Sequence, residues 1–308
     1  MLKAFLLIIV GLAGDPEHGK TFHKWGTTLA QASERLGVPP ERVAYLVDAP
    51  IEGDARVTGR STRDDIAKAL EAFAAQAGPE DILFVTLIGH GNFDGRAAKF
   101  NLPGPDLAAA DFNALLKKLP AKQIVFVNTT SSSGPFIEEL SGPGRTIVTA
   151  TRNGAEQFAT LFGGYFVDAL TSDVADADKN KRISVLEAFS YARAEVERAY
   201  KREGLLATEH ALLDDNGDKE GSADPSAQGK DGKVASVISL GLAEDSALPA
   251  DPKLRALHLE RRELERRVEA LRLLKDSMEP ARYTKELESL VTAIALKTRE
   301  IRTAEGQQ

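Results

Sequence analysis

The sequence predicts an α/β fold with a mostly parallel central sheet covered by helices on both faces. Apolar runs of strand length recur at residues 4–10, 43–47, 81–88, 123–128 and 145–150. Stretches with apolar residues at helical spacing lie between and after them, at residues 28–36, 61–76, 111–119 and 156–170. Continuously apolar strands are typical of a sheet buried on both faces, and their alternation with amphipathic helices favours parallel strands.

The composition narrows the class of protein. The chain has 308 residues, of which 43% are hydrophobic and 28% charged, so an ordinary globular core can form. A formal net charge of −7 argues against nucleic acid as a partner. The absence of cysteine excludes disulfides, thiolate metal sites and a cysteine nucleophile. Outside the N-terminal run, no stretch approaches the ~18 apolar residues that a membrane span needs.

The N-terminal run at residues 4–10 predicts a buried first strand, with the core of a short signal peptide as the alternative interpretation. The next segment, GDPEHGKT at 14–21, matches the phosphate-binding pattern G-x-x-x-x-G-K-[ST]. Such a loop binds phosphate through backbone N–H groups, but Pro16 lacks one, and the carboxylates of Asp15 and Glu17 would repel the ligand. We therefore interpret it as a plain strand-to-helix loop and keep nucleotide binding as the weakest alternative.

The residues best suited to catalysis directly follow two of the predicted strands. The run at 81–88 leads into Gly89-His90-Gly91, and the run at 123–128 leads into five hydroxyl residues, 129–133, followed by Gly134. Neighbouring parallel strands would bring these ends to one edge of the sheet. A base beside a nucleophile, with a glycine N–H as donor, is the arrangement that acyl transfer needs.

These two strand ends resemble those of the caspase/legumain-like cysteine peptidases, in particular the bacterial legumain-like branch. The family's His-Gly falls on His90-Gly91, and its Cys-x-Ser-Gly falls on residues 131–134. The run at 146–157 is similar to the strand that shapes the family's substrate pocket. The resemblance covers residues 1–215 and implies a three-layer caspase-like fold. It also implies His90 as base, position 131 as nucleophile, and an oxyanion hole from the amides of Gly91 and Ser131.

The chain departs from the family at the decisive residue, because Ser131 stands where the family has cysteine. A serine hydroxyl is far less acidic than a thiol and needs an aligned base with an orienting partner. A weak or inactive pseudo-peptidase is therefore the first interpretation. A serine-dependent peptidase or esterase that uses Ser131 and His90 is the alternative, and replacement of the nucleophile by engineering is the third.

Residues 176–187 resemble a calcium-binding EF-hand loop. The backbone carbonyl of Arg182 falls at position 7 of such a loop. Side-chain oxygens fall at positions 1, 3, 5, 9 and 12, which are Asp176, Asp178, Asn180, Ser184 and Glu187 in that order. Lys181 replaces the glycine expected at position 6, where φ is positive, which should weaken or distort the site. The loop predicts a Ca²⁺ site, with a metal-free acidic capping loop as the alternative. A second acidic turn at 214–218 lacks an acid at position 12 and is interpreted as a turn.

The chain after residue 170 changes character. A helix is expected at 184–203, an irregular extension or linker at 216–251, and an antiparallel helical hairpin at 252–308 with its turn at 277–280. The hairpin is expected to dock on the domain or support self-association. The Glu209-His210 pair is interpreted as a packed or surface pair, with a contribution to the cleft as the alternative. Peptides or proteins are the expected ligands, and a calcium site without cysteines favours an exported, periplasmic protein over a cytoplasmic one.

Overall fold

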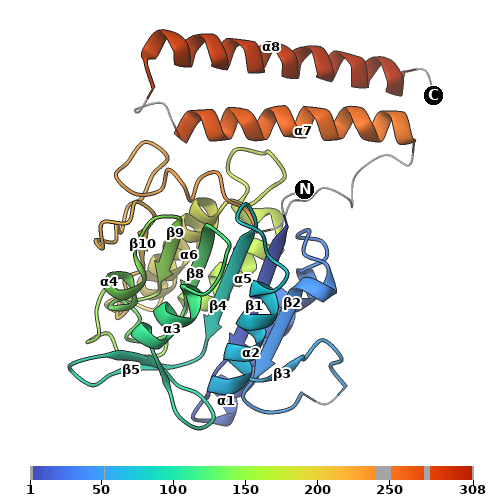
Figure 1. The fold of residues 1–308 in the computed structure, drawn as a ribbon. Helices are drawn as coiled ribbons and strands as arrows, with labels where there is room; N and C mark the ends of the chain where they lie inside the picture. The colour runs from blue at the N-terminus through green and yellow to red at the C-terminus, as the bar shows by residue number, and fades with distance from the viewer. Residues whose placement is uncertain (1–2, 52, 241–250, 274–277, 307–308) are drawn as a thin grey trace. The chain divides into compact units, whose positions relative to one another are not determined.

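The computed structural model describes residues 3–51, 53–240, 251–273 and 278–306. Residues up to Leu242 form one compact unit, and residues from Ala243 onward form a second (Figure 1). The first unit therefore extends beyond residue 215, where the resemblance ended. Of the predicted features, Ser277 of the hairpin turn and the end of the 216–251 segment lie outside the described residues.

A seven-stranded sheet forms the centre of the first unit, in the order β10-β9-β8-β4-β1-β2-β3. All neighbours pair in parallel except β10, which runs antiparallel to β9. The strands are β1 (Ala4–Val10), β2 (Val43–Val47), β3 (Gly59–Arg60), β4 (Ile82–Ile88), β8 (Gln123–Asn128), β9 (Arg145–Thr149) and β10 (Leu212–Asp214). The five predicted strands are confirmed. Short β3 and β10 were not predicted, because two or three residues carry no periodicity.

Helices cover both faces of this sheet, as predicted. They are α1 (Pro16–Ala32), α2 (Arg63–Ala74), α3 (Ala109–Leu116), α4 (Phe136–Leu140), α5 (Phe162–Thr171) and α6 (Val185–Arg202). Side chains alternate across a strand, so Leu6, Ile8 and Val10 of β1 face α1, α5 and α6. Phe5, Leu7 and Ile9 face α2, α3 and α4. Two hydrophobic cores thus sandwich a fully buried β1, whose residues are all at most 4% exposed.

Two helices begin elsewhere than the apolar spacing predicts. α1 begins at Pro16 rather than near residue 28, because Asp15 caps it and Pro16 occupies its first turn. Most of the segment interpreted as a loop at 14–21 is therefore helical. α5 begins at Phe162 rather than at residue 156, because the preceding residues form a loop that bonds to the end of β8.

A small second sheet follows β4 and consists of β5 (Gly91–Phe93), β6 (Ala98–Phe100) and β7 (Leu107–Ala108). Two 3₁₀ turns, Pro40–Arg42 and Asp173–Ala175, complete the first unit. The second sheet begins at Gly91, so the chain that leaves β4 is held in extended form directly after His90.

The second unit is the predicted helical hairpin, formed by α7 (Pro252–Leu273) and α8 (Pro280–Glu305). Its apolar seam is centred on Val268, Leu271 and Leu290. Glu279 caps α8, and Pro280 begins it, as the sequence predicts. None of the described helices is long and apolar enough to cross a membrane.

Candidate functional site

The carboxyl ends of β4 and β8 place His90 and Ser131 at the same edge of the sheet. The two strands pair in parallel, and Leu87 lies opposite Asn128 at their ends. Gly89, with a φ of +151°, turns the chain out of β4 in a conformation that favours glycine. The topology therefore brings the two predicted loops together, as the sequence suggested.

The hydroxyl of Ser131 is held by the backbone of Gly91. Ser131 Oγ donates to the Gly91 carbonyl at 2.9 Å and accepts from the Gly91 N–H at 3.2 Å. Ser131 is only 2% exposed. A Cβ atom added to Gly91 would lie 2.4 Å from the Ser131 carbonyl oxygen, so the two loops pack too closely for any other residue at position 91.

His90 is half-buried and lies against α1. Its ring centroid is 4.9 Å from that of His18 and 5.1 Å from that of Phe22. Burial lowers the pKa of His90, the neighbouring His18 lowers it further, and the Ala13 carbonyl acts in the opposite direction. The imidazole is thus favoured in its neutral form, but within the described residues no hydrogen bond joins it to Ser131.

The hydroxyl row, which follows β8, makes structural bonds at the ends of two other strands, β4 and β9. Thr129 Oγ1 donates to the Leu87 carbonyl at 2.7 Å, and Ser132 Oγ donates to the Gly154 carbonyl at 3.0 Å. Ser133 Oγ bonds to Thr151 Oγ1 at 3.1 Å. All five residues from 129 to 133 are at most 2% exposed. The row therefore joins the end of β8 to the loops that follow β4 and β9.

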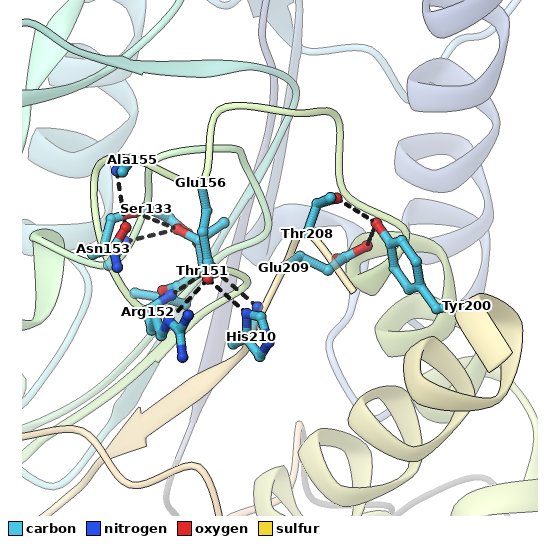
Figure 2. Close-up of polar contacts among 12 residues, drawn as sticks. Ser133, Thr151, Arg152, Asn153, Ala155, Glu156, Tyr200, Thr208, Glu209 and His210 are labelled. Atoms are coloured by element: carbon cyan, nitrogen blue, oxygen red, sulfur yellow. Dashed lines mark hydrogen bonds and ion pairs between the residues drawn. The ribbon is translucent and has the colours of Figure 1, made fainter. Parts of the chain in front are cut away.

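Glu156, in the loop after β9, is a site residue that sequence reasoning missed. Its carbonyl accepts from Ser132 N at 2.8 Å, and its carboxylate bonds to His210 Nδ1 at 2.6 Å and to Arg152 Nε at 3.1 Å (Figure 2). Glu156 thus connects the hydroxyl row to the residue that precedes β10. Nothing in the local sequence signals this role, because it depends on the antiparallel pairing of β10 with β9.

The Glu209-His210 pair divides into two roles. Glu209 is 3% exposed, and its carboxylate accepts from Leu161 N at 2.8 Å and Phe162 N at 3.1 Å, at the start of α5. Tyr200 Oη also donates to it, at 3.3 Å (Figure 2). Burial raises the pKa of Glu209, although these hydrogen bonds oppose the shift. Glu209 is therefore packed, whereas half-buried His210 lies beside the loop that covers the hydroxyl row.

A cavity of about 300 Å³ lies next to this pair. Its lining includes Phe162, Arg193, Val196, Glu209, His210 and Ala211. Its lining is mostly apolar, and it includes the charged side chains of Arg193 and Glu209. Such a cavity suits a side chain of a bound peptide better than a phosphate group.

The phosphate-binding pattern at 14–21 has no free cradle. The Asp15 carboxylate accepts from the N–H groups of Glu17 and His18, both at 2.9 Å. Asp15 also bonds to His18 Nδ1 at 2.6 Å. The amide donors that a phosphate would need at this helix start are therefore already used by the chain's own carboxylate.

The acidic loop at 176–187 brings oxygen ligands together. One carboxylate oxygen from each of Asp176, Asp178 and Glu187 lies within 4.8 Å of the others. Lys181 adopts a φ of +64°, the conformation for which the family of EF-hand loops uses glycine. The Ser184 hydroxyl caps α6 by accepting from Glu187 N at 3.1 Å, and it donates to Glu187 Oε2 at 2.8 Å. Asn180 Oδ1 accepts from Arg182 N at 2.8 Å.

The chain was compared with models of known protein families. A model of the Peptidase C13 family, the legumain family, matches residues 63–213. This range runs from α2 to β10 and contains His90, Gly91 and Ser131. No curated protein matches the chain. The match and the fold support a legumain-like, peptidase-related protein.

Proposed function

We propose that the legumain-like domain binds peptide or protein segments and hydrolyses them feebly or not at all. The observation that carries this proposal is the position of the Ser131 hydroxyl, which bonds to both the N–H and the carbonyl of Gly91. A nucleophile must instead give its proton to a base and approach the substrate carbonyl. In this arrangement, the hydroxyl proton is directed to a backbone oxygen.

The chemistry of serine adds to this geometry. A thiol with a pKa near ~8.5 has a useful thiolate fraction near neutral pH, but an alcohol does not. Serine enzymes overcome this with a base that bonds the hydroxyl and a third group that orients the base. His90 lies against His18 and Phe22, and Asp15 bonds His18 rather than His90.

The oxyanion donor carried over from the family is also engaged. The Gly91 N–H points to Ser131 Oγ at 3.2 Å, so a substrate carbonyl would have to displace that hydroxyl. The donor itself remains in place, at the start of β5. Substrate recognition can therefore persist where catalysis does not.

A serine-dependent peptidase or esterase is the second candidate. It is favoured by the lowered pKa of His90, because a neutral imidazole is the state that a general base needs. This candidate requires Ser131 to leave Gly91 and to turn toward His90.

The acidic loop supports a further part of the proposal, a Ca²⁺ ion bound at residues 176–187. Carboxylate oxygens of Asp176, Asp178 and Glu187 would hold it, with Asn180 and the Arg182 carbonyl as neutral ligands. Such a site would fix the start of α6. A calcium-dependent protein without cysteine suits an exported, periplasmic location.

The α7–α8 hairpin is the surface proposed for self-association.

Chemical labelling of a Ser131→Cys variant tests the pseudo-peptidase proposal. If the site still orients a nucleophile, the new thiol should react with iodoacetamide faster than that of Ser190→Cys, which places a thiol on the exposed face of α6. Adding His90→Ala should slow the labelling, because imidazolium stabilises the thiolate. Wild type should show no turnover of peptide substrates and no capture by a fluorophosphonate.

One outcome would contradict this proposal, and another would narrow it to binding. Covalent capture of wild type at Ser131 by the fluorophosphonate, lost in Ser131→Ala, would establish the serine hydrolase. A Ser131→Cys thiol as slow as that of Ser190→Cys would show that the nucleophile position no longer supports chemistry, which leaves binding alone.

A further inference from the structure

A second group of acids lies where β10 ends. Asp214, Asp215 and Asp231 are 0%, 7% and 2% exposed, and Asp218 stands at the surface beside them. Buried carboxylates normally have a hydrogen-bond or charge partner for each oxygen, because water no longer solvates them. The partners of these four residues therefore show which of them serve the fold.

Two of the four acids are accounted for by the protein itself. Asp215 accepts from Gly232 N at 2.9 Å and from Ala235 N at 2.8 Å, one bond to each oxygen. Asp218 bonds to Lys230 Nζ at 2.6 Å and accepts from Glu220 N at 2.8 Å. Asp215 is thus a structural cap, and Asp218 belongs to a surface ion pair.

Asp214 and Asp231 are not satisfied in this way. Asp214 Oδ1 accepts from Asn216 N and Gly217 N, but Oδ2 is buried and has no partner among the described residues. Asp231 Oδ1 has one long contact, from Asp215 N at 3.3 Å. Because Asp215 directly follows Asp214, this contact places the Asp231 carboxylate beside the backbone at the end of β10.

We propose that Asp214 and Asp231 bind a divalent cation, Ca²⁺, at the end of β10. Two carboxylates supply the charge, and the side-chain oxygen of Asn216, which accepts from Asp218 N at 2.8 Å, is the candidate neutral ligand. Oxygen ligands of this kind, with a loop that can adjust, suit Ca²⁺ better than Mg²⁺, which demands near-ideal octahedral geometry. This site is separate from the loop at 176–187.

Asp214 Oδ2 is buried and has no hydrogen-bond donor among the described residues. A cation bound there would supply the missing partner of this oxygen.

The site has a consequence for the rest of the unit. Asp215 holds the amides of Gly232 and Ala235, and the carbonyl of Ala235 accepts from Leu186 N at 3.0 Å. Leu186 lies in the first turn of α6, after the loop at 176–187. A cation at Asp214 and Asp231 would thus fix the segment against which the other acidic loop is packed.

Calorimetric titration of the full chain with CaCl₂ at pH 7, after treatment with chelator, tests the proposal. Wild type should bind two ions, and Asp178→Asn, which disables only the loop at 176–187, should bind one. Asp214→Asn or Asp231→Asn added to Asp178→Asn should remove the remaining ion. Asp224→Asn, which alters an exposed acid outside the group, should still bind two.

The outcomes separate this site from the proposed loop site. One ion in wild type that is lost in Asp214→Asn but kept in Asp178→Asn would support the present site and contradict the loop. A folded Asp178→Asn protein that binds no Ca²⁺ would overturn the proposal, and this reading does not depend on the buried variants folding.

Discussion

The hydroxyl row at 129–133 and the acidic loop at 176–187 both place polar side chains in close succession, but they differ in exposure and in how their groups converge. The row is buried, and its hydroxyls bond to backbone oxygens or to neighbouring side chains at separate points. The carboxylates of the loop also accept from nearby N–H groups, but oxygens from three of them converge at one partly exposed point. Convergence of several charged oxygens, rather than the number of polar residues, is what distinguishes a candidate ligand site from a structural cluster.

The largest effect should come from changing the packing under the row. Gly91→Ala should destabilise the fold by about 3 kcal/mol, because the added Cβ would lie 2.4 Å from the Ser131 carbonyl oxygen and 2.6 Å from Thr130 Oγ1. Gly142→Ala is the matched control, since its Cβ would meet nothing within 4 Å. Urea unfolding measures both. Equal stability of the two variants would mean that the row is not packed against the end of β4.

The acidic loop at 176–187 should make the melting temperature depend on Ca²⁺. Binding to the folded state alone stabilises by ~2.7 kcal/mol at a hundredfold excess over Kd, or a rise of about 5–10 °C in Tm. Asp178→Asn should lose the part of this rise in Tm that comes from the loop at 176–187. In chelator it should melt like wild type, because Asn keeps the oxygen that accepts from Asn180 N. A full calcium response in Asp178→Asn would exclude the loop as a ligand site.

The smallest effect should come from Lys20→Ala in the phosphate-binding pattern. Lys20 is exposed, and Asp15 occupies the amides of the helix start, so stability should change by less than about 0.5 kcal/mol. Calorimetry with Mg-ATP should show no binding to wild type or variant. ATP binding by the wild type that is lost in Lys20→Ala would instead support a nucleotide site at residues 14–21.

Sequence reasoning recovers the parts of this fold that depend on local pattern. Apolar runs predict the five long strands, and the spacing in 176–187 predicts three carboxylates that the structure brings within 4.8 Å. The start of α1 was missed, because its first turns are polar and carry no apolar spacing, although Asp15 and Pro16 are a recognisable start signal.

The rest of the site depends on contacts between distant segments. Glu156 and His210 are 54 residues apart and meet only because β10 returns antiparallel to β9. The bonds between Ser131 and Gly91 span 40 residues and depend on a close approach that only glycine permits. The parallel strands predicted that both residues would reach one edge, but whether their side chains would face each other could not be read from the pattern.

The two edge strands of the central sheet affect how readily the protein aggregates at high concentration. One edge strand, β3, has two residues and carries Arg60. The other, β10, has three residues and is bridged on its outer side by Ser222, which exchanges hydrogen bonds of 3.0 and 2.8 Å with Leu213. Long unpaired edges are templates on which other chains add strands and aggregate. This sheet offers no such template at either end, so high concentration should not convert it into stacked strands.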